Sequence, residues 1–303
     1  MRPRFVLPVL LAAAVGAVLL AVPGTRSLLA PRAPAATPSA VPPRRPVHVA
    51  GQPPPPGPVL RAPAGPLAVP QTWFFGWALL DRGSGTVAGS DNRDTGANTT
   101  ESMIKPWLAA DYLRRAGTAG RRPSQQELGE LAAMIIRSDD TAAEKYYRLG
   151  GTTAVIDRLV TLCGLTHTSA YDYWWSLTSM SPADSVRMGQ CLADGTAAGP
   201  QWTGWLLDTM RHVTGTVSDQ QVSTGGGRWG IVDGLPPVLA GDLALKNGWT
   251  RTGADGLWHV NCLGISSKWI LSVMLRYPIA RGLQYGAGIC AAVTRQLLYT
   301  PDI

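Results

Sequence analysis

The chain has 303 residues, of which 45% are hydrophobic, and a formal net charge of +7, so it holds enough apolar material for a folded core. The positive charge does not indicate a nucleic-acid-binding domain. Residues 1–70 contain seven arginines and no acidic residue, which leaves residues 71–303 with a net charge of 7 − 7 = 0.

The N-terminal segment is typical of an exported protein. Residues 1–22 combine two arginines with an apolar run, which fits either a signal peptide or a single membrane anchor. Residues 23–70 are rich in proline and alanine and lack apolar periodicity, so we expect a linker to one domain over residues 71–303. No cysteine precedes Cys163, so a lipid-modified N-terminal cysteine is not expected. We predict an extracytoplasmic protein, either secreted or held at the membrane by this segment.

The domain carries strand patterns at both ends and helical patterns between them. In chain order, the expected elements are a hairpin over 72–88, helices beginning at Ser124, Thr152 and Ser181, strands over 243–249, 257–265 and 269–277, and a helix over 285–298. Strands at both ends with helices between them imply a single sheet. The prediction is an α+β fold: an α/β sandwich whose antiparallel sheet is built from both chain ends, with an inserted all-helical subdomain.

The chain has four cysteines, which in an exported protein favour two disulfides over four structural thiols. Three pairings are possible. We favour Cys163 with Cys191, both in helical segments, and Cys262 with Cys290, which would join a strand to the final helix. No C-x-x-C motif occurs and the four histidines are scattered, so we expect neither a metal site nor a cofactor.

The strongest chemical signal lies in residues 100–107, TESMIKPW. Ser102 and Lys105 are three residues apart, so on one helix face the lysine amine could act as a base for the serine hydroxyl. Pro106 fits the first turn of such a helix, where a missing N–H costs little. At a helix N-terminus, free N–H groups favour an alkoxide and an anionic intermediate. The pattern therefore predicts a nucleophilic serine beside an oxyanion hole.

Two further motifs follow in the chain: Ser138-Asp139-Asp140 and Lys246-Asn247-Gly248. With the S-x-x-K motif, they make residues 71–303 resemble the serine β-lactamase and penicillin-binding protein superfamily, and class A β-lactamases in particular. The stretch IIRSDDTAA, followed by LGG at 149–151, is also similar to the corresponding helical region of class A enzymes. This resemblance implies a β-lactamase/transpeptidase-like fold.

The resemblance also implies a role for each motif. Ser102 would be the acylated nucleophile and Lys105 its base partner. Ser138 would relay a proton to the leaving nitrogen, and Lys246 would anchor a substrate carboxylate. The substrate-binding residues that it implies are Asp140, Asn247 and Gly248. The substrate would be a small molecule or peptide, such as a β-lactam or a peptidoglycan-like amide, and no nucleic acid is expected.

Several positions depart from the family pattern. Asp140 stands where asparagine is usual, and an ionised carboxylate only accepts hydrogen bonds. Asn247 replaces a threonine or serine. No glutamate follows Glu144, so the usual deacylating base is missing; Asp172 is the nearby stand-in, with a loop-capping role as its other interpretation. Two functions remain open: an exported serine hydrolase or acyltransferase that deacylates slowly, or a catalytically impaired pseudoenzyme that acts as a binding module of the cell envelope.

Overall fold

The computed structural model describes residues 59–60, 67–222 and 225–299. The segment predicted as a signal peptide or anchor, residues 1–22, lies outside the described residues. Within the described ranges, no helix is long and apolar enough to cross a membrane.

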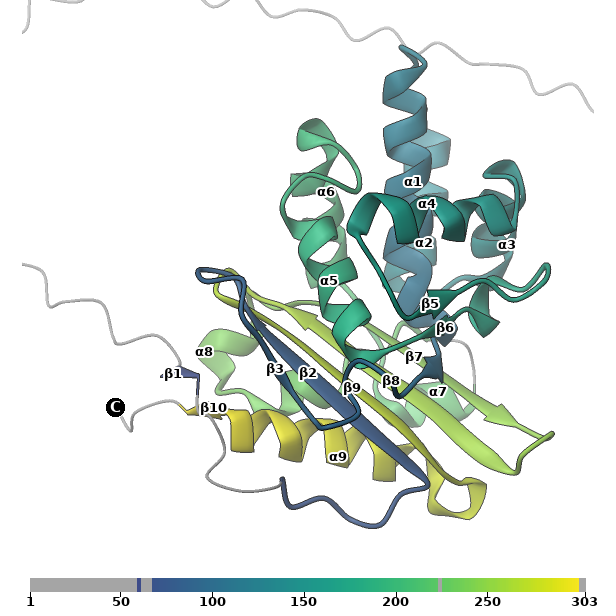
Figure 1. The fold of residues 1–303 in the computed structure, drawn as a ribbon. Helices are drawn as coiled ribbons and strands as arrows, with labels where there is room; N and C mark the ends of the chain where they lie inside the picture. The colour runs from purple at the N-terminus through teal and green to yellow at the C-terminus, as the bar shows by residue number, and fades with distance from the viewer. Residues whose placement is uncertain (1–58, 61–66, 223–224, 300–303) are drawn as a thin grey trace, which may run out of the picture. The chain divides into compact units, whose positions relative to one another are not determined.

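A five-stranded antiparallel sheet runs through the domain in the order β3-β2-β9-β8-β7 (Figure 1). Its strands are β2 (Phe74–Asp81), β3 (Val87–Gly89), β7 (Ala244–Thr252), β8 (Leu257–Ile265) and β9 (Trp269–Pro278). β2 pairs with β9 along its whole length, from Phe74↔Arg276 to Asp81↔Trp269. Strands from the two ends of the domain therefore meet in one sheet, which confirms the predicted α+β arrangement.

Helices cover both faces of this sheet (Figure 1). Because side chains alternate along a strand, β9 presents Ile270 to one face and Tyr277 to the other. A Cβ on Gly189 of α5 (Pro182–Ala193) would lie 2.8 Å from Ile270, and one on Gly286 of α9 (Gly282–Leu297) would lie 2.5 Å from the Tyr277 hydroxyl. These glycines allow both helices to approach the sheet closely. β9 is thus buried on both faces, which explains its nearly continuous apolar sequence.

The inserted helical part lies between β3 and β7 in the chain. Besides α5, its longer helices are α1 (Lys105–Thr118), α2 (Gln125–Ile136), α3 (Asp140–Leu149), α4 (Thr153–Cys163) and α6 (Pro200–Arg211). The predicted capping box is present: the Ser124 hydroxyl accepts from the Glu127 N–H, and the Glu127 carboxylate accepts from the Ser124 N–H. At the start of α5 the Ser181 hydroxyl accepts from the Asp184 N–H, and Pro182 is the first residue of the helix.

Short elements connect these parts. They are β4 (Asn98–Thr99), η1 (Glu101–Ile104), β5 (Thr168–Ser169), η2 (Trp175–Leu177), β6 (Ser179–Met180), α7 (Val217–Val222), η3 (Gly230–Gly234), α8 (Pro237–Ala240) and η4 (Ile279–Arg281). β4, β6 and β5 form a small antiparallel sheet.

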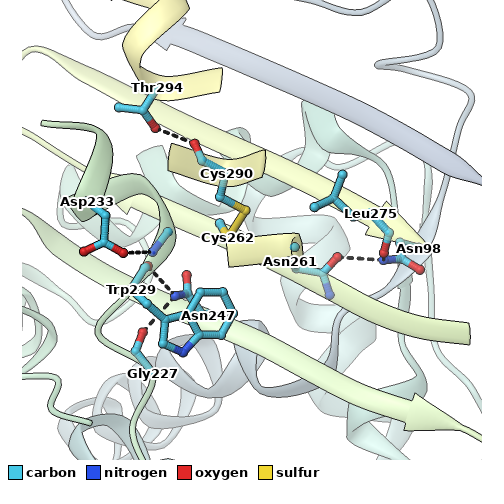
Figure 2. The surroundings of a disulfide bond; sticks show 12 residues. Asn98, Gly227, Trp229, Asp233, Asn247, Asn261, Cys262, Leu275, Cys290 and Thr294 are labelled. Carbon is cyan, nitrogen blue, oxygen red and sulfur yellow. Dashed lines mark hydrogen bonds between the residues drawn. A yellow bond between two sulfur atoms is a disulfide. The ribbon is translucent and has the colours of Figure 1, made fainter. Parts of the chain in front are cut away.

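Both predicted disulfides are present. Cys163 at the end of α4 is bonded to Cys191 of α5, and Cys262 of β8 is bonded to Cys290 of α9 (Figure 2). The first lies in the helical part and the second ties the sheet to its covering helix.

The linker predicted over residues 23–70 includes segments that pack on the domain. β1 (Val59–Leu60) pairs antiparallel with β10 (Leu298–Tyr299). Nearby, the Ala68 N–H donates to Gln296 Oε1 at 2.9 Å, and Gln296 Nε2 donates back to the Ala68 carbonyl at 3.0 Å. Backbone pairing needs no apolar periodicity, so composition did not reveal it. The packed structure therefore begins upstream of the boundary predicted at residue 71.

Candidate active site

Ser102 lies in η1, the 3-10 turn between β4 and α1, and the turn is anchored on both sides. The Thr100 N–H donates to the Thr178 carbonyl at 2.9 Å, and the Lys105 N–H donates to the Ser102 carbonyl. Met103 and Ile104 are fully buried, whereas Ser102 is half-buried. The sequence placed Ser102 at the start of a helix; it lies one turn earlier, with α1 beginning at Lys105.

Gly248 lets the backbone of β7 approach this turn closely. A Cβ at this position would lie 2.4 Å from the Thr100 carbonyl, 2.6 Å from the Met103 nitrogen and 2.9 Å from the Ser102 nitrogen. No residue larger than glycine fits without displacing backbone. This contact brings the backbone of β7, just after Lys246, against the backbone nitrogen of Ser102.

A pair of asparagines holds the turn against the sheet. Asn261 of β8 donates from Nδ2 to the carbonyls of Thr99, at 2.8 Å, and Thr100, at 3.2 Å. Its Oδ1 accepts from Asn98 Nδ2 at 2.9 Å, and Asn98 also donates to the Leu275 carbonyl (Figure 2). Both amides are buried, so these bonds fix the position of the residues just before Ser102.

Ser138 lies between two buried lysines. Its Oγ is 3.1 Å from Lys105 Nζ and 2.9 Å from Lys246 Nζ, and its carbonyl accepts from Lys105 Nζ at 2.6 Å. Ser138 has a positive φ of 58°, which is uncommon for a residue with a side chain, and it immediately precedes Asp139, the N-cap of α3. The structure thus brings Lys105, Ser138 and Lys246 together. Among the described residues, the Ser102 side chain makes no hydrogen bond to them or to any other group.

Lys105 is fully buried and paired with a carboxylate. Its Nζ donates to Asp140 Oδ1 at 2.5 Å and lies 4.9 Å from the centre of the Trp175 ring. Burial lowers the pKa of Lys105, and the attraction and hydrogen bond of Asp140 oppose that effect. Asp140 itself is exposed over 63% of its side chain, so the only solvent-facing part of this ion pair is its carboxylate.

Lys246 is also fully buried, but its hydrogen-bond partners are all neutral. Its Nζ bonds to Ser138 Oγ at 2.9 Å and to the carbonyls of Gly226 and Asn247, each at 3.3 Å. Burial lowers the pKa of Lys246 well below its usual value, the charge of Lys105 lowers it further, and Asp140 opposes both effects. Two buried amines this close to one hydroxyl therefore compete for positive charge.

Asn247 is buried and its amide is already engaged. Nδ2 donates to the carbonyls of Gly227 and Trp229, each at 2.8 Å (Figure 2). In this structure the side chain holds the 227–229 segment beside β7. A substrate contact by Asn247 stays a prediction.

Asp172 lies between β5 and η2, and Trp175 is the first residue of η2. Asp172 is exposed and, among the described residues, forms no hydrogen bond with Ser102 or Lys105, so its role as a deacylation base stays a prediction. Trp175 is buried, and its ring packs against Lys105. An apolar ring therefore occupies one side of the lysine amine.

Sequence reasoning missed the surroundings of Glu101, the residue before Ser102. Glu101 is buried, with a positive φ of 48°, and its Oε1 accepts from Thr99 Oγ1 at 2.7 Å. The same hydroxyl lies 2.7 Å from His259 Nδ1, and His259 Nε2 lies 2.7 Å from Asp255 Oδ2. Burial raises the pKa of Glu101, against opposing hydrogen bonds from Thr99 and Thr250.

One signal in the sequence could have led to this network. His259 and Asn261 are two residues apart in a strand, so both project from the same face of β8. They meet the turn before Ser102 together. The position of the acidic Glu101 just before the apolar residues Met103 and Ile104 was a second signal for the same network.

Known proteins resemble this chain in sequence and in structure. A family model described as the β-lactamase enzyme family matches residues 119–217. The proteins named putative lipoprotein LppW from Mycobacterium bovis and Mycobacterium tuberculosis are 29% identical over 211 residues, which is 66% of this chain. The match spans 62% of the length of these curated relatives, less than two thirds.

Solved structures are similar at lower identity. The TLA-1 extended-spectrum β-lactamase has a TM-score of 0.57 at 16% identity, and a β-lactamase from Chitinophaga pinensis has 0.57 at 15%. An ancestral class A β-lactamase has a TM-score of 0.55 at 18% identity. Each match covers 74% of this chain and 92% of the other. The TM-scores show a shared fold, and at identities this low the comparison shows the fold alone.

Proposed function

We propose that this chain, which has the fold of the serine β-lactamase-like superfamily, is an exported serine hydrolase or acyltransferase that forms an acyl-enzyme at Ser102. Its substrate would be an envelope peptide, another amide or a β-lactam. The name of the LppW relatives, putative lipoproteins, supports an extracytoplasmic location for this chain. The proposed chemistry needs no metal or cofactor.

One observation carries the proposal: the Ser138 hydroxyl bridges two fully buried lysine amines, at 3.1 and 2.9 Å. Burying one ammonium group is costly, and burying a second beside it adds repulsion between like charges. Such an arrangement works against stability, so we interpret it as acid–base machinery. Titratable groups with perturbed pKa values cluster at catalytic sites, so this pair of amines marks a candidate site.

The chemistry follows from the site. Ser102 Oγ would attack a carbonyl carbon, and the negative charge that develops on the carbonyl oxygen would be met by the Ser102 N–H and an N–H of β7 near Gly248. The C–N bond would then break, leaving an ester at Ser102. The proton lost by the hydroxyl would reach the leaving nitrogen through the lysine–serine cluster.

Release of the acyl group should be slow. No glutamate follows Glu144, and Asp172 is exposed. The Trp175 ring packs against Lys105. General-base assistance typically contributes about 10²–10⁴-fold, so its loss would lengthen the life of the acyl-enzyme by about that factor. We therefore propose behaviour closer to that of a penicillin-binding protein than to that of an efficient β-lactamase.

The test is labelling of the purified protein with a fluorescent penicillin and with a fluorophosphonate, followed by intact-protein mass spectrometry. The wild type should gain one adduct, and Ser102→Ala should gain none. Ser169→Ala, a change at an exposed serine of β5, is the matched control and should label normally. Equal labelling of Ser102→Ala would remove Ser102 as the nucleophile.

A second measurement tests deacylation. Turnover of a chromogenic cephalosporin should be slow and should match the lifetime of the Ser102 adduct. Asp172→Asn should leave that lifetime unchanged. Fast turnover that is lost in Asp172→Asn would show that Asp172 acts as the deacylation base, against this proposal.

The second candidate function is a pseudoenzyme that binds envelope material without reacting. Asn247 favours it, because the amide that would contact a substrate instead holds the 227–229 segment. Reversible, saturable binding of soluble peptidoglycan fragments, with no mass added at Ser102, would support this function over the hydrolase.

A further inference from the structure

The two lysines that share the Ser138 hydroxyl differ in one respect. Lys105 Nζ contacts a carboxylate, Asp140 Oδ1, at 2.5 Å, together with the carbonyl and the hydroxyl of Ser138. Lys246 Nζ contacts a hydroxyl and two carbonyls, and none of its hydrogen-bond partners among the described residues is charged.

Hydrogen bonding alone allows either lysine to carry the charge. An ammonium group on Lys105 would donate to its three acceptors, and Ser138 would donate its own proton to a neutral Lys246, whose two N–H bonds serve the carbonyls. The reverse assignment also satisfies every donor and acceptor: a charged Lys246 donates three times, and Ser138 donates to a neutral Lys105. The choice therefore rests on electrostatics.

The carboxylate decides between the two arrangements. A charge on Lys105 lies in contact with Asp140, whereas a charge on Lys246 would be stabilised by carbonyl dipoles and by a more distant carboxylate. Asp139 also attracts Lys105, and the other charged groups facing the pair are Asp140 and the partner lysine. The Trp175 ring faces Lys105 and the Trp249 ring faces Lys246, at 4.9 and 5.7 Å. These rings favour neither lysine strongly.

We propose that Lys105 is the charged lysine of the resting site and that Lys246 is the neutral amine, which takes the Ser102 proton through Ser138. The catalytic step in this assignment rests on the proposed function. The charge states of the two lysines do not. It exchanges the roles that the sequence resemblance implied for the two lysines. Asp140, in place of an asparagine, is the cause of the exchange.

The proton transfers balance. As the Ser102 Oγ–carbon bond forms, the Ser102 proton passes to Ser138 Oγ, and the proton of Ser138 passes to Lys246 Nζ. When the C–N bond breaks, Lys246 returns a proton through Ser138 to the leaving nitrogen. The products are a serine ester and an N–H group, and Lys246 is neutral again. The route requires Ser138 Oγ to hydrogen-bond with Ser102 Oγ in the substrate complex. Lys105, one turn from Ser102, stays charged and stabilises the alkoxide.

Burial acts on the pKa of both amines in the same direction. It lowers the pKa of Lys246 well below the usual lysine value, with the Lys105 charge adding to the effect. The pKa of Lys105 is also lowered by burial, but Asp140 opposes that effect by contact and by a hydrogen bond. These directions agree with the assignment made from the contacts.

The charge states can be measured directly because the chain has four lysines: Lys105, Lys145, Lys246 and Lys268. In protein labelled with ¹³C at lysine, each Cε signal is assigned by through-bond correlation to its backbone and followed as the pH changes. The partly or fully exposed Lys145 and Lys268 serve as internal references. Lys246 should be neutral at pH 7 and should titrate below Lys105. A Lys246 that titrates above Lys105 would overturn the proposal.

A pair of variants tests the cause. Asp140→Asn should lower the titration midpoint of Lys105, because it removes the contacting carboxylate. Asp139→Asn makes the same charge change one residue away, where the side chain caps α3 instead of bonding to Lys105, and should have a smaller effect. Equal effects of the two variants would refute a specific role for the Asp140 contact.

The catalytic part is tested by substitutions that retain positive charge. Lys246→Arg, which cannot give up a proton, should lose about 10²-fold or more of Ser102 labelling, and Lys105→Arg, which keeps the charge assigned to that position, should lose less. The reverse result would return the base role to Lys105. A wild type that forms no adduct yet has a neutral Lys246 would exclude the proposed hydrolase and retain the charge assignment, so the two failures are distinguishable.

Discussion

Lys105 and Asp140 form an ion pair in which one partner is fully buried and the other is exposed over 63% of its side chain. We expect a substrate bound at Ser102 to contact the exposed carboxylate of this pair. Because an ionised carboxylate accepts hydrogen bonds but donates none, this edge of the site should favour substrates that bring a donor or a positive charge.

We expect the protein to be acylated faster by ampicillin, which carries an ammonium group on its side chain, than by the neutral benzylpenicillin side chain. Asp140→Asn should shift the ratio of the two acylation rates toward benzylpenicillin by about tenfold, since a hydrogen bond to a charged group contributes about 1.5–3 kcal/mol. The ratio is the useful quantity, because any change in the charge of Lys105 affects both reactions. An unchanged ratio would show that Asp140 does not contact this part of the substrate.

Gly248→Ala should separate β7 from the Ser102 turn. The added Cβ would lie within 2.9 Å of three backbone atoms, so the strand or the turn must move. We expect Ser102 labelling to fall by about 10²-fold, as when one oxyanion donor is lost, and the free energy of unfolding to fall by about 1–3 kcal/mol. Gly253→Ala is the matched control, because a Cβ there meets nothing within 4 Å.

Glu101 should make stability depend on pH. Its folded-state pKa is raised by burial, so above the unfolded pKa the folded protein holds a proton that the unfolded chain has lost. The contribution of Glu101 to stability is therefore fully present below the unfolded pKa, near 4.5, and is lost as the pH rises through the folded pKa. Glu101→Gln should remove this loss, because glutamine stays neutral.

The measurement is urea unfolding of wild type and Glu101→Gln at pH 4 and pH 8. The variant should gain stability relative to the wild type at the higher pH. Glu144→Gln, which removes the charge of the surface ion pair with Arg148 on α3, should show no comparable gain. If the wild type were more stable than Glu101→Gln by the same amount at both pH values, folding would not raise the pKa of Glu101.

The two disulfides offer a comparison with a built-in control. Both close loops with a sequence separation of 28, so the chain-entropy effect of removing either is the same, about 3–4 kcal/mol. Cys262 pairs with Asn247 across β7 and β8, and a Cβ on Gly230 would lie 2.9 Å from its sulfur. Replacing Cys262 and Cys290 by alanine should therefore reduce Ser102 labelling as well as thermal stability.

Replacing Cys163 and Cys191 by alanine should lower thermal stability alone, with labelling retained at temperatures where the variant is folded. That bond joins α4 to α5, and neither helix contributes a residue to the hydrogen bonds of Lys105 and Lys246 with Ser138 and Asp140. Equal loss of labelling in both pairs of variants would show that labelling follows global stability and not the local support of β7.

Much of the fold could be predicted because its signals are local. The capping box at Ser124 and the Ser181-Pro182 start of α5 are short motifs with their own hydrogen bonds. The strands β7, β8 and β9 have alternating or continuous apolar sequences and are joined by polar turns. The comparisons with known proteins bear out the superfamily resemblance that the ordered motifs indicated.

What could not be predicted depends on contacts between distant residues. The spacing of Ser102 and Lys105 does not reveal that Asp140 pairs with Lys105, or that a Trp175 ring lies against it. Nor does the KNG motif reveal that Asn247 turns its amide toward the 227–229 segment. In each case the partner residue belongs to another element, so the contact depends on how the elements pack in the folded chain.

The pairing of β1 with β10 places the two ends of the described part of the chain next to each other, with Val59 opposite Tyr299. Paired residues in adjacent strands lie about 4.5–5.5 Å apart, so a linker of a few residues could join them. The chain could then be reopened in the exposed turn between β7 and β8, near Gly253, to give a circular permutant with the same contacts. In such a permutant Lys246 would lie close to the new C-terminus, and the active site should assemble unchanged. Only the position of the chain ends would differ, because Ser102, Ser138 and Lys246 keep their order.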